Sequence, residues 1–101
     1  MKNIGYAFAT KMLVDSKRKV RFMYREEGED NDSGWRFFCG EEDQDYLDNP
    51  DNSAIYDVHD ILDIDKSILP YLQSAAGTAF ERENDNETFK VITNFSLDVK
   101  E

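Results

Sequence analysis

Short stretches rich in apolar and aromatic residues recur along the chain, and in residues 20–25 apolar and polar residues alternate, which is typical of a strand that buries one face. The stretches are residues 6–9, 20–25, 35–39, 78–82 and 88–93. Glycines and polar residues separate them, as expected for turns. The second and third are joined by an acidic segment with two glycines, so we expect a hairpin with a long loop. Residues 4–14 fit a short helix as well as a strand, although Tyr6 and Phe8 favour a strand at the start.

The alternation also predicts which side chains share a face of each strand. On residues 20–25 the shared face carries Val20, Phe22 and Tyr24. On residues 35–39 it carries Trp35, Phe37 and Cys39. Aromatic strand residues mostly pack into cores, and a cysteine among them usually behaves as a small hydrophobe. We therefore expect Trp35 to be a core residue and Cys39 to be buried beside it.

Helical spacing appears in shorter segments between these stretches. The expected helical segments are residues 12–14, 43–47, 56–64 and a stretch after Asp65 that carries Ile68, Leu69 and Leu72. Thr10 and Asp65 stand where N-cap residues are preferred. Pro70 leaves the register of the last segment open, because proline removes a backbone donor. Together these patterns predict one α+β domain over residues 1–101, an antiparallel sheet of four or five strands with short helices inserted in the middle of the chain.

Acidic residues outnumber basic ones by 22 to 12, and the net charge of −10 is concentrated in the middle of the chain. Residues 25–57 carry twelve acidic and two basic side chains. Such a segment repels nucleic acid and anionic lipid and attracts a basic protein, so we expect a protein partner and no nucleic acid or membrane. The candidate partner-binding residues are Glu41, Glu42, Asp43, Asp45 and Tyr46. The alternative is that these acidic loops serve only solubility.

The chain offers few residues for catalysis or metal binding. His59 is its one histidine and Cys39 its one cysteine, which is too few for a typical zinc site and leaves little to build a catalytic triad from. Residues 29–34 resemble the start of an EF-hand loop, but the last calcium-ligand position falls on Gly40, which has no carboxylate. We expect no cofactor, no structural metal ion and no enzymatic activity. A single cysteine and the lack of a long apolar run favour a cytoplasmic protein.

Four segments carry a resemblance to a known family. They are residues 22–27, the run Asp32-Ser33-Gly34-Trp35-Arg36 with the residues that follow it as far as Glu42, residues 46–52, and residues 77–82. These segments resemble the immunity protein 33 family of small bacterial domains. The resemblance implies a role in polymorphic toxin systems, in which such a protein protects its producer by binding a toxin domain.

Several residues of these segments are expected to be structural. They are Arg25, Asp32, Ser33, Gly34, Trp35, Arg36 and Asn52. Asp32, Ser33 and Asn52 are of the kind that fix turns through hydrogen bonds from side chain to backbone. We expect Arg25 and Arg36 to pair with nearby carboxylates. As an alternative to a core position, Trp35 would anchor a protein interface together with Tyr46.

The leading interpretation is therefore a non-catalytic binding protein, an immunity protein that neutralises a cognate toxin by direct contact. A basic toxin domain, such as a nuclease, would suit the acidic loops. The alternative is a small housekeeping or regulatory binding domain with no toxin partner. A third class is an enzyme that holds a divalent metal ion in the acidic loop. A toxin gene immediately upstream would favour the first interpretation over the second.

Overall fold

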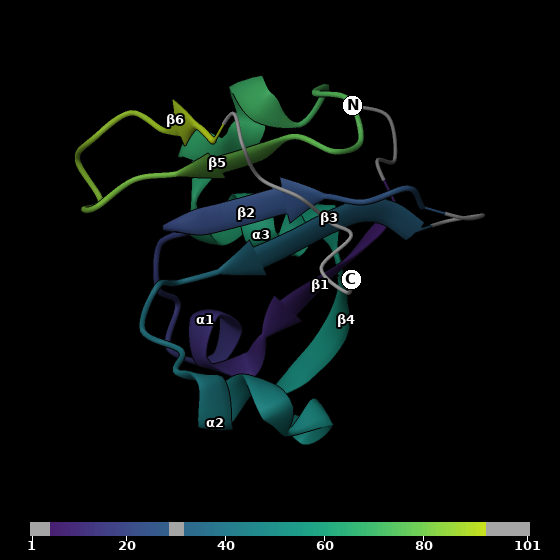
Figure 1. Ribbon diagram of the computed structural model, residues 1–101, viewed down its shortest axis with the longest axis vertical. Coiled ribbons are helices and arrows are strands. Elements are labelled where there is room, and N and C mark those ends of the chain that lie inside the picture. The colour runs from purple at the N-terminus through teal and green to yellow at the C-terminus, as the bar shows by residue number, and fades with distance from the viewer. Residues whose placement is uncertain (1–4, 29–31, 93–101) are drawn as a thin grey trace.

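The structure is a computed structural model that describes residues 5–28 and 32–92. Its strands are β1 (Tyr6–Thr10), β2 (Phe22–Arg25), β3 (Asp32–Phe38), β4 (Ser53–Asp57), β5 (Ala79–Glu81) and β6 (Lys90–Val91). Its helices are α1 (Lys11–Asp15), α2 (Gln44–Asp48) and α3 (Val58–Ile64), together with the 3₁₀ helices η1 (Pro50–Asn52) and η2 (Lys66–Tyr71). The strands form one sheet in the order β4-β1-β3-β2-β5-β6 (Figure 1).

The predicted α+β class is confirmed, although the sheet has six strands rather than four or five and is mixed. β1 and β3 are parallel, and the other neighbouring pairs are antiparallel. Parallel neighbours need a crossover connection. Here the chain leaves β1 through α1, forms β2, and returns as β3 between β1 and β2. The predicted hairpin of β2 and β3 is confirmed, and its loop includes residues outside the described ranges.

The predicted helix over residues 56–64 is wrong at its start. Residues 53–57 pair with β1 as the antiparallel strand β4, and α3 begins only at Val58. The change of structure falls at Asp57, whose side chain caps α3 by accepting a hydrogen bond from the N–H of His59. The other predicted helical segments are confirmed as α1 after Thr10, α2 after Asp43, and η2 after Asp65.

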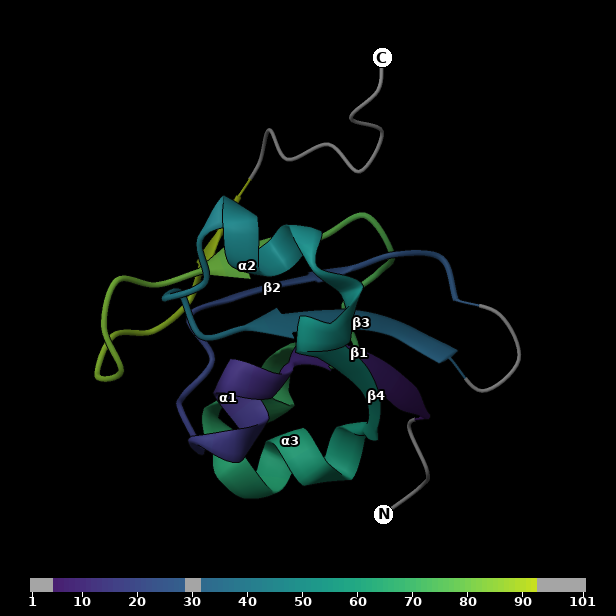
Figure 2. The same cartoon turned by 90° about the horizontal axis from the view of Figure 1, so that it is seen from below.

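The sheet has two unlike faces. Figure 2 shows α1 and α3 on one side of the sheet and α2 on the other. Strand residues on the side of α1 and α3 pack into the core, and they include Ala7, Ala9, Met23, Trp35, Phe37 and Phe80. Alternate positions point to the other side, which we call the open face, and its large apolar residues are Tyr6, Phe8, Phe22, Tyr24, Phe38 and Ile55.

The predicted face of residues 20–25 is wrong for Val20. Val20 precedes β2, is fully buried, and donates its N–H to the Asp65 carboxylate rather than to a neighbouring strand. Met23 is the β2 residue that packs into the core. Phe22 and Tyr24 do share a face, but it is the open face.

A buried ion pair ties the middle of the chain to its last strands. The side chains of Asp65 and Arg82 are each 3% exposed, and Arg82 Nη2 lies 2.6 Å from Asp65 Oδ2. Asp65 also accepts hydrogen bonds from the N–H groups of Val20 and Ser67. Arg82 donates to the carbonyl oxygen of Val20 and to two carbonyl oxygens of the loop after β5. The pair therefore holds η2, the approach to β2 and this loop together.

The ion pair should make stability depend on pH in a defined direction. Burial alone raises the pKa of Asp65, but the hydrogen bonds from Ser67 and Val20 and the charge of Arg82 outweigh burial and lower it. A lowered pKa stabilises the fold above the pKa of the unfolded chain, about 3.9, and this stabilisation is lost as the pH falls through the folded value. We expect the stability advantage of wild type over Asp65→Asn to be constant above about pH 5 and to shrink on acidification below about pH 4.

Urea unfolding of both proteins at a series of pH values measures this difference. The comparison cancels the effect of the chain's net charge of −10, which both proteins nearly share. An advantage that grows as the pH falls would contradict the assignment of an ionised, stabilising Asp65.

Candidate functional site

A row of side chains crosses the open face from one strand to the next. Residues directly opposite in neighbouring strands point to the same side of a sheet. Ile55 of β4 lies opposite Phe8 of β1, and Phe8 lies opposite Arg36 of β3. Arg36 in turn lies opposite Tyr24 of β2. The row is therefore apolar on both sides of a single arginine.

Three aromatic rings pack together at one side of this row. The ring centroids of Phe22 and Phe38 are 5.6 Å apart, and those of Phe22 and Tyr24 are 5.8 Å apart. Tyr24 and Phe38 stack with their centroids 6.0 Å apart. These distances are typical of stabilising aromatic pairs. The rings therefore support one another as a fixed apolar surface on the outside of the sheet.

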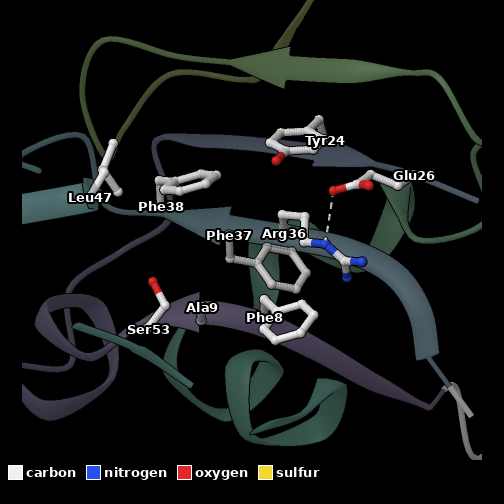
Figure 3. Close-up of a pocket in the computed structure, with 9 residues that line it drawn as sticks. All are labelled: Phe8, Ala9, Tyr24, Glu26, Arg36, Phe37, Phe38, Leu47 and Ser53. Carbon is white, nitrogen blue, oxygen red and sulfur yellow. Dashed lines mark hydrogen bonds and ion pairs between the residues drawn. The ribbon is translucent and has the colours of Figure 1, made fainter. Parts of the chain in front are cut away.

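Three hollows lie along the open face. The largest has a volume of about 330 Å³ and lies between Phe8, Tyr24, Phe38 and Leu47, with Glu26 and Arg36 at one side (Figure 3). A second hollow, of about 200 Å³, is lined by Phe22, Phe38, Gly40, Glu42 and Leu47. A third, of about 110 Å³, is lined by Tyr6, Ala7, Phe8, Asp32 and Ile55. The open face is therefore hollowed along its length.

Arg36 holds the charges of the open face in place. Its Nε lies 3.1 Å from Glu26 Oε2, and its Nη2 lies 3.0 Å from Asp32 Oδ2. Its Cζ lies 4.5 Å from the centre of the Phe8 ring, within range of a cation–π contact. The hydrogen bond from Arg36 lowers the pKa of Asp32, so this carboxylate stays ionised to a lower pH than an ordinary aspartate. The predicted pairing of Arg36 with carboxylates is confirmed.

The run Asp32-Ser33-Gly34 forms an irregular start to β3. The register with β1 shifts there, since Tyr6 lies opposite Asp32 while Phe8 lies opposite Arg36. Asp32 Oδ1 accepts a hydrogen bond from the Gly34 N–H, and Ser33 Oγ accepts one from the next N–H along the chain. These are the turn-fixing bonds expected of aspartate and serine. They fix the backbone directly before Arg36.

Trp35 is fully buried, as predicted, and its Nε1 donates to the carbonyl oxygen of Leu72. The prediction that Arg25 pairs with carboxylates is wrong. Its guanidinium donates instead to the carbonyl oxygens of Ser33, Leu72 and Ser74 and lies over the Trp35 ring. The carbonyl groups of Leu72 and Ser74 follow η2, and no further helical turn supplies N–H donors to them. Arg25 supplies these donors instead.

Most of the predicted partner-binding residues make contacts within the chain. Glu42 accepts hydrogen bonds from the Thr10 hydroxyl and from the N–H groups of Cys39 and Gly40. Asp43 caps α2. The Tyr46 hydroxyl accepts the N–H of Met12, and Asn52 donates its side-chain amide to the Tyr46 carbonyl oxygen. These contacts attach α2 to the sheet.

The role of the acidic residues in binding stays a prediction. Glu41 and Asp45 are exposed, and Glu41 lies 3.7 Å from Arg18. The attachment of α2 fixes the position of Leu47, which lines two of the three hollows. The residues just before Leu47 were predicted to bind a partner, whereas Leu47 itself was not.

Cys39 and His59 belong to different elements and make different local contacts. Cys39 directly follows β3 and is buried, and burial raises the pKa of its thiol. His59 Nδ1 lies 3.1 Å from Asp57 Oδ1, within the cap of α3. Among the residues that the structure describes, no group of three or more His, Cys, Asp or Glu side chains is placed to hold a metal ion. None of the described helices is long and apolar enough to cross a membrane.

We expect Cys39 to react slowly with an aromatic disulfide reagent in the folded protein. The thiolate is the reactive species, and both its burial and its raised pKa reduce the available thiolate. Labelling should be at least about tenfold slower than in the same protein unfolded in urea. Equal rates would show that residues 35–39 have the opposite register, with Cys39 facing solvent.

Comparison with known proteins gives a family match for this chain. The family model described as the Immunity protein Imm33 domain matches residues 7–93. No match was found among curated proteins, and none among solved structures. The matched region contains each of the described strands except the first residue of β1, so the open face and the buried ion pair both lie within it. The chain therefore belongs to the Imm33 family of immunity protein domains.

Proposed function

We propose that this protein neutralises a cognate toxin by binding it directly, without a catalytic step, in the cytoplasm of the cell that produces it. The observation that carries the proposal is the match of the Imm33 family model across residues 7–93. A partner protein follows from an immunity role, because immunity is defined against a toxin. Direct contact and a cytoplasmic location are the steps that we add to that role.

The open face supports neutralisation by contact. Its aromatic rings are packed against one another before any partner arrives, so little side-chain freedom remains to be lost on binding. Aromatic residues of this kind are enriched at the centre of protein interfaces, where they contribute most of the affinity. Cys39, the one thiol of the chain, is buried and has a raised pKa, which makes it a poor nucleophile.

Co-expression in a bacterial host tests the proposal. The toxin to use is the toxin domain encoded by the gene immediately upstream of this one. We expect this domain to stop growth when expressed alone, and growth to be restored when the wild-type immunity protein is expressed with it. A pull-down from the same cells should recover both proteins together. An upstream product that is not toxic, or a toxicity that this protein does not relieve, would contradict the proposal.

A further inference from the structure

The three hollows of the open face adjoin one another, and we call them together the groove. The third and the largest hollow share Phe8, and the largest and the second share Phe38 and Leu47. The groove therefore runs from Ile55 on the edge strand β4, across β1 and β3, to Leu47 and Phe22. Figure 3 shows the middle of this course, with Phe8, Phe38 and Leu47 around a common space.

The groove gathers the exposed apolar residues of the molecule. Six large hydrophobic residues are exposed in the part of the chain that the structure describes, and four of them line the groove. These four are Tyr6 at 48%, Phe8 at 39%, Leu47 at 38% and Ile55 at 60%. Single exposed apolar residues are ordinary on protein surfaces, but a contiguous set marks an interaction site. The occupant must therefore present apolar side chains.

The charges around the groove define the rest of the occupant. Among the residues that the structure describes, the acidic ones that line it are Glu26, Asp32 and Glu42, and Arg36 is the one cation. Arg36 is paired with both Glu26 and Asp32, so these three side chains together keep an excess of one negative charge. Two further carboxylates, Asp45 and Asp48, lie on α2 on either side of Leu47 in the sequence. A segment with lysine or arginine beside its apolar residues would complement these charges.

We propose that this groove receives an apolar segment of the toxin flanked by lysine or arginine side chains. The proposal rests on the proposed function. A second copy of the chain fits less well, because it carries the same net charge of −10 and would bring like charges together. Residues 93–101 of the chain itself contain one lysine and two acidic residues, so their net charge is negative and complements the groove less well than a cationic segment would.

Matched substitutions test the apolar part of the groove. Leu47→Ser removes an exposed leucine from the groove, and Leu69→Ser removes one of similar exposure from η2, outside it. Ile55→Ser removes a second, more exposed groove residue. For the upstream-encoded toxin domain, we expect Leu47→Ser and Ile55→Ser each to weaken the affinity about tenfold or more, as for residues central to an interface. Leu69→Ser should stay within about twofold of wild type, since it lies outside the proposed contact.

A second pair of variants tests the charges. The double variant Asp45→Asn, Asp48→Asn should slow association with the toxin and reduce its dependence on salt. The matched control Asp60→Asn, Asp63→Asn removes the same charge from exposed positions of α3, on the other side of the sheet, and should do neither. Equal association rates for both double variants would overturn the cationic part of the proposal.

The results separate this proposal from the proposed function. If wild type does not bind the toxin, the proposed function fails. If wild type binds but Leu47→Ser and Ile55→Ser bind equally well while unfolding at wild-type urea concentrations, the groove fails and the proposed function stands. If sedimentation shows a wild-type dimer that Leu47→Ser dissociates, a second copy fills the groove and the proposal is overturned. The proposal is also overturned if deletion of residues 93–101 abolishes the effect of Leu47→Ser on affinity.

Discussion

Arg82→Met should lower the free energy of unfolding by about 3–5 kcal/mol, a large part of the total stability of a domain of this size. The substitution keeps much of the side-chain volume but leaves the Asp65 carboxylate buried without its cation. It also removes the donor to the Val20 carbonyl oxygen and the guanidinium that lies 4.3 Å from the centre of the Phe89 ring. The cost arises mainly from the uncompensated charge, because a buried ion is expensive to desolvate alone.

Arg21→Met is the matched control for this prediction. Arg21 also pairs with an aspartate, at 2.7 Å from Asp85, and also donates to a carbonyl oxygen, that of Glu83. Its ion pair is open to solvent, so its loss should barely move the urea midpoint. Urea unfolding of the three proteins measures the contrast. Similar midpoints for Arg82→Met and Arg21→Met would mean that the buried pair does not hold the fold together.

Gly34→Ala should cost about 3 kcal/mol or more, at the upper end of the range for single substitutions. Gly34 has a φ of +89°, which an alanine adopts only with strain. A Cβ at this position would also lie 2.0 Å from the carbonyl oxygen of Glu26, so the backbone itself would have to move. The hydrogen bond from the Glu26 N–H to the Gly34 carbonyl oxygen, at 2.8 Å, lies at the same point and would be disturbed.

Gly77→Ala separates the two sources of this cost. Gly77 has a φ of +93°, but a Cβ there would meet no atom within 4 Å. It should therefore cost only the backbone strain, about 1–2 kcal/mol. Urea unfolding measures how much more unfolding free energy Gly34→Ala loses than Gly77→Ala. This difference is the cost of the close approach of β3 to the chain after β2. Equal costs for the two variants would show that the chain relieves this approach without loss of stability.

The elements that local pattern specifies were predictable from the sequence. The strand-to-helix change at Thr10, the cap at Asp65, and the core position of Trp35 follow from residue type and spacing alone. β4 was missed because its residues alternate weakly and run directly into the helical spacing of α3. The parallel pairing of β1 with β3 depends on contacts far apart in sequence, which no local pattern encodes.

The groove could not be predicted from the sequence as a whole, although the apolar pattern of two strands indicates part of it. Strands that bury one face usually place polar residues on the other. In residues 6–9 and 22–24, by contrast, both alternate sets are apolar or aromatic, which predicts apolar side chains on both faces of the sheet there. Leu47 gave no such signal, because its place in the groove depends on the contacts of Glu42 and Tyr46 that fix α2.

Titration of the purified upstream-encoded toxin with this protein tests neutralisation by contact most directly. The toxin's activity is measured at a fixed toxin concentration well above the dissociation constant, while the immunity protein is added in increasing amounts. Neutralisation by contact predicts that activity falls in proportion to the protein added, stops at a fixed stoichiometry, and does so at once. Loss of activity that continues with time at a small fraction of an equivalent would mean a catalytic mechanism, and undiminished activity at a large excess would mean that this toxin is not the partner.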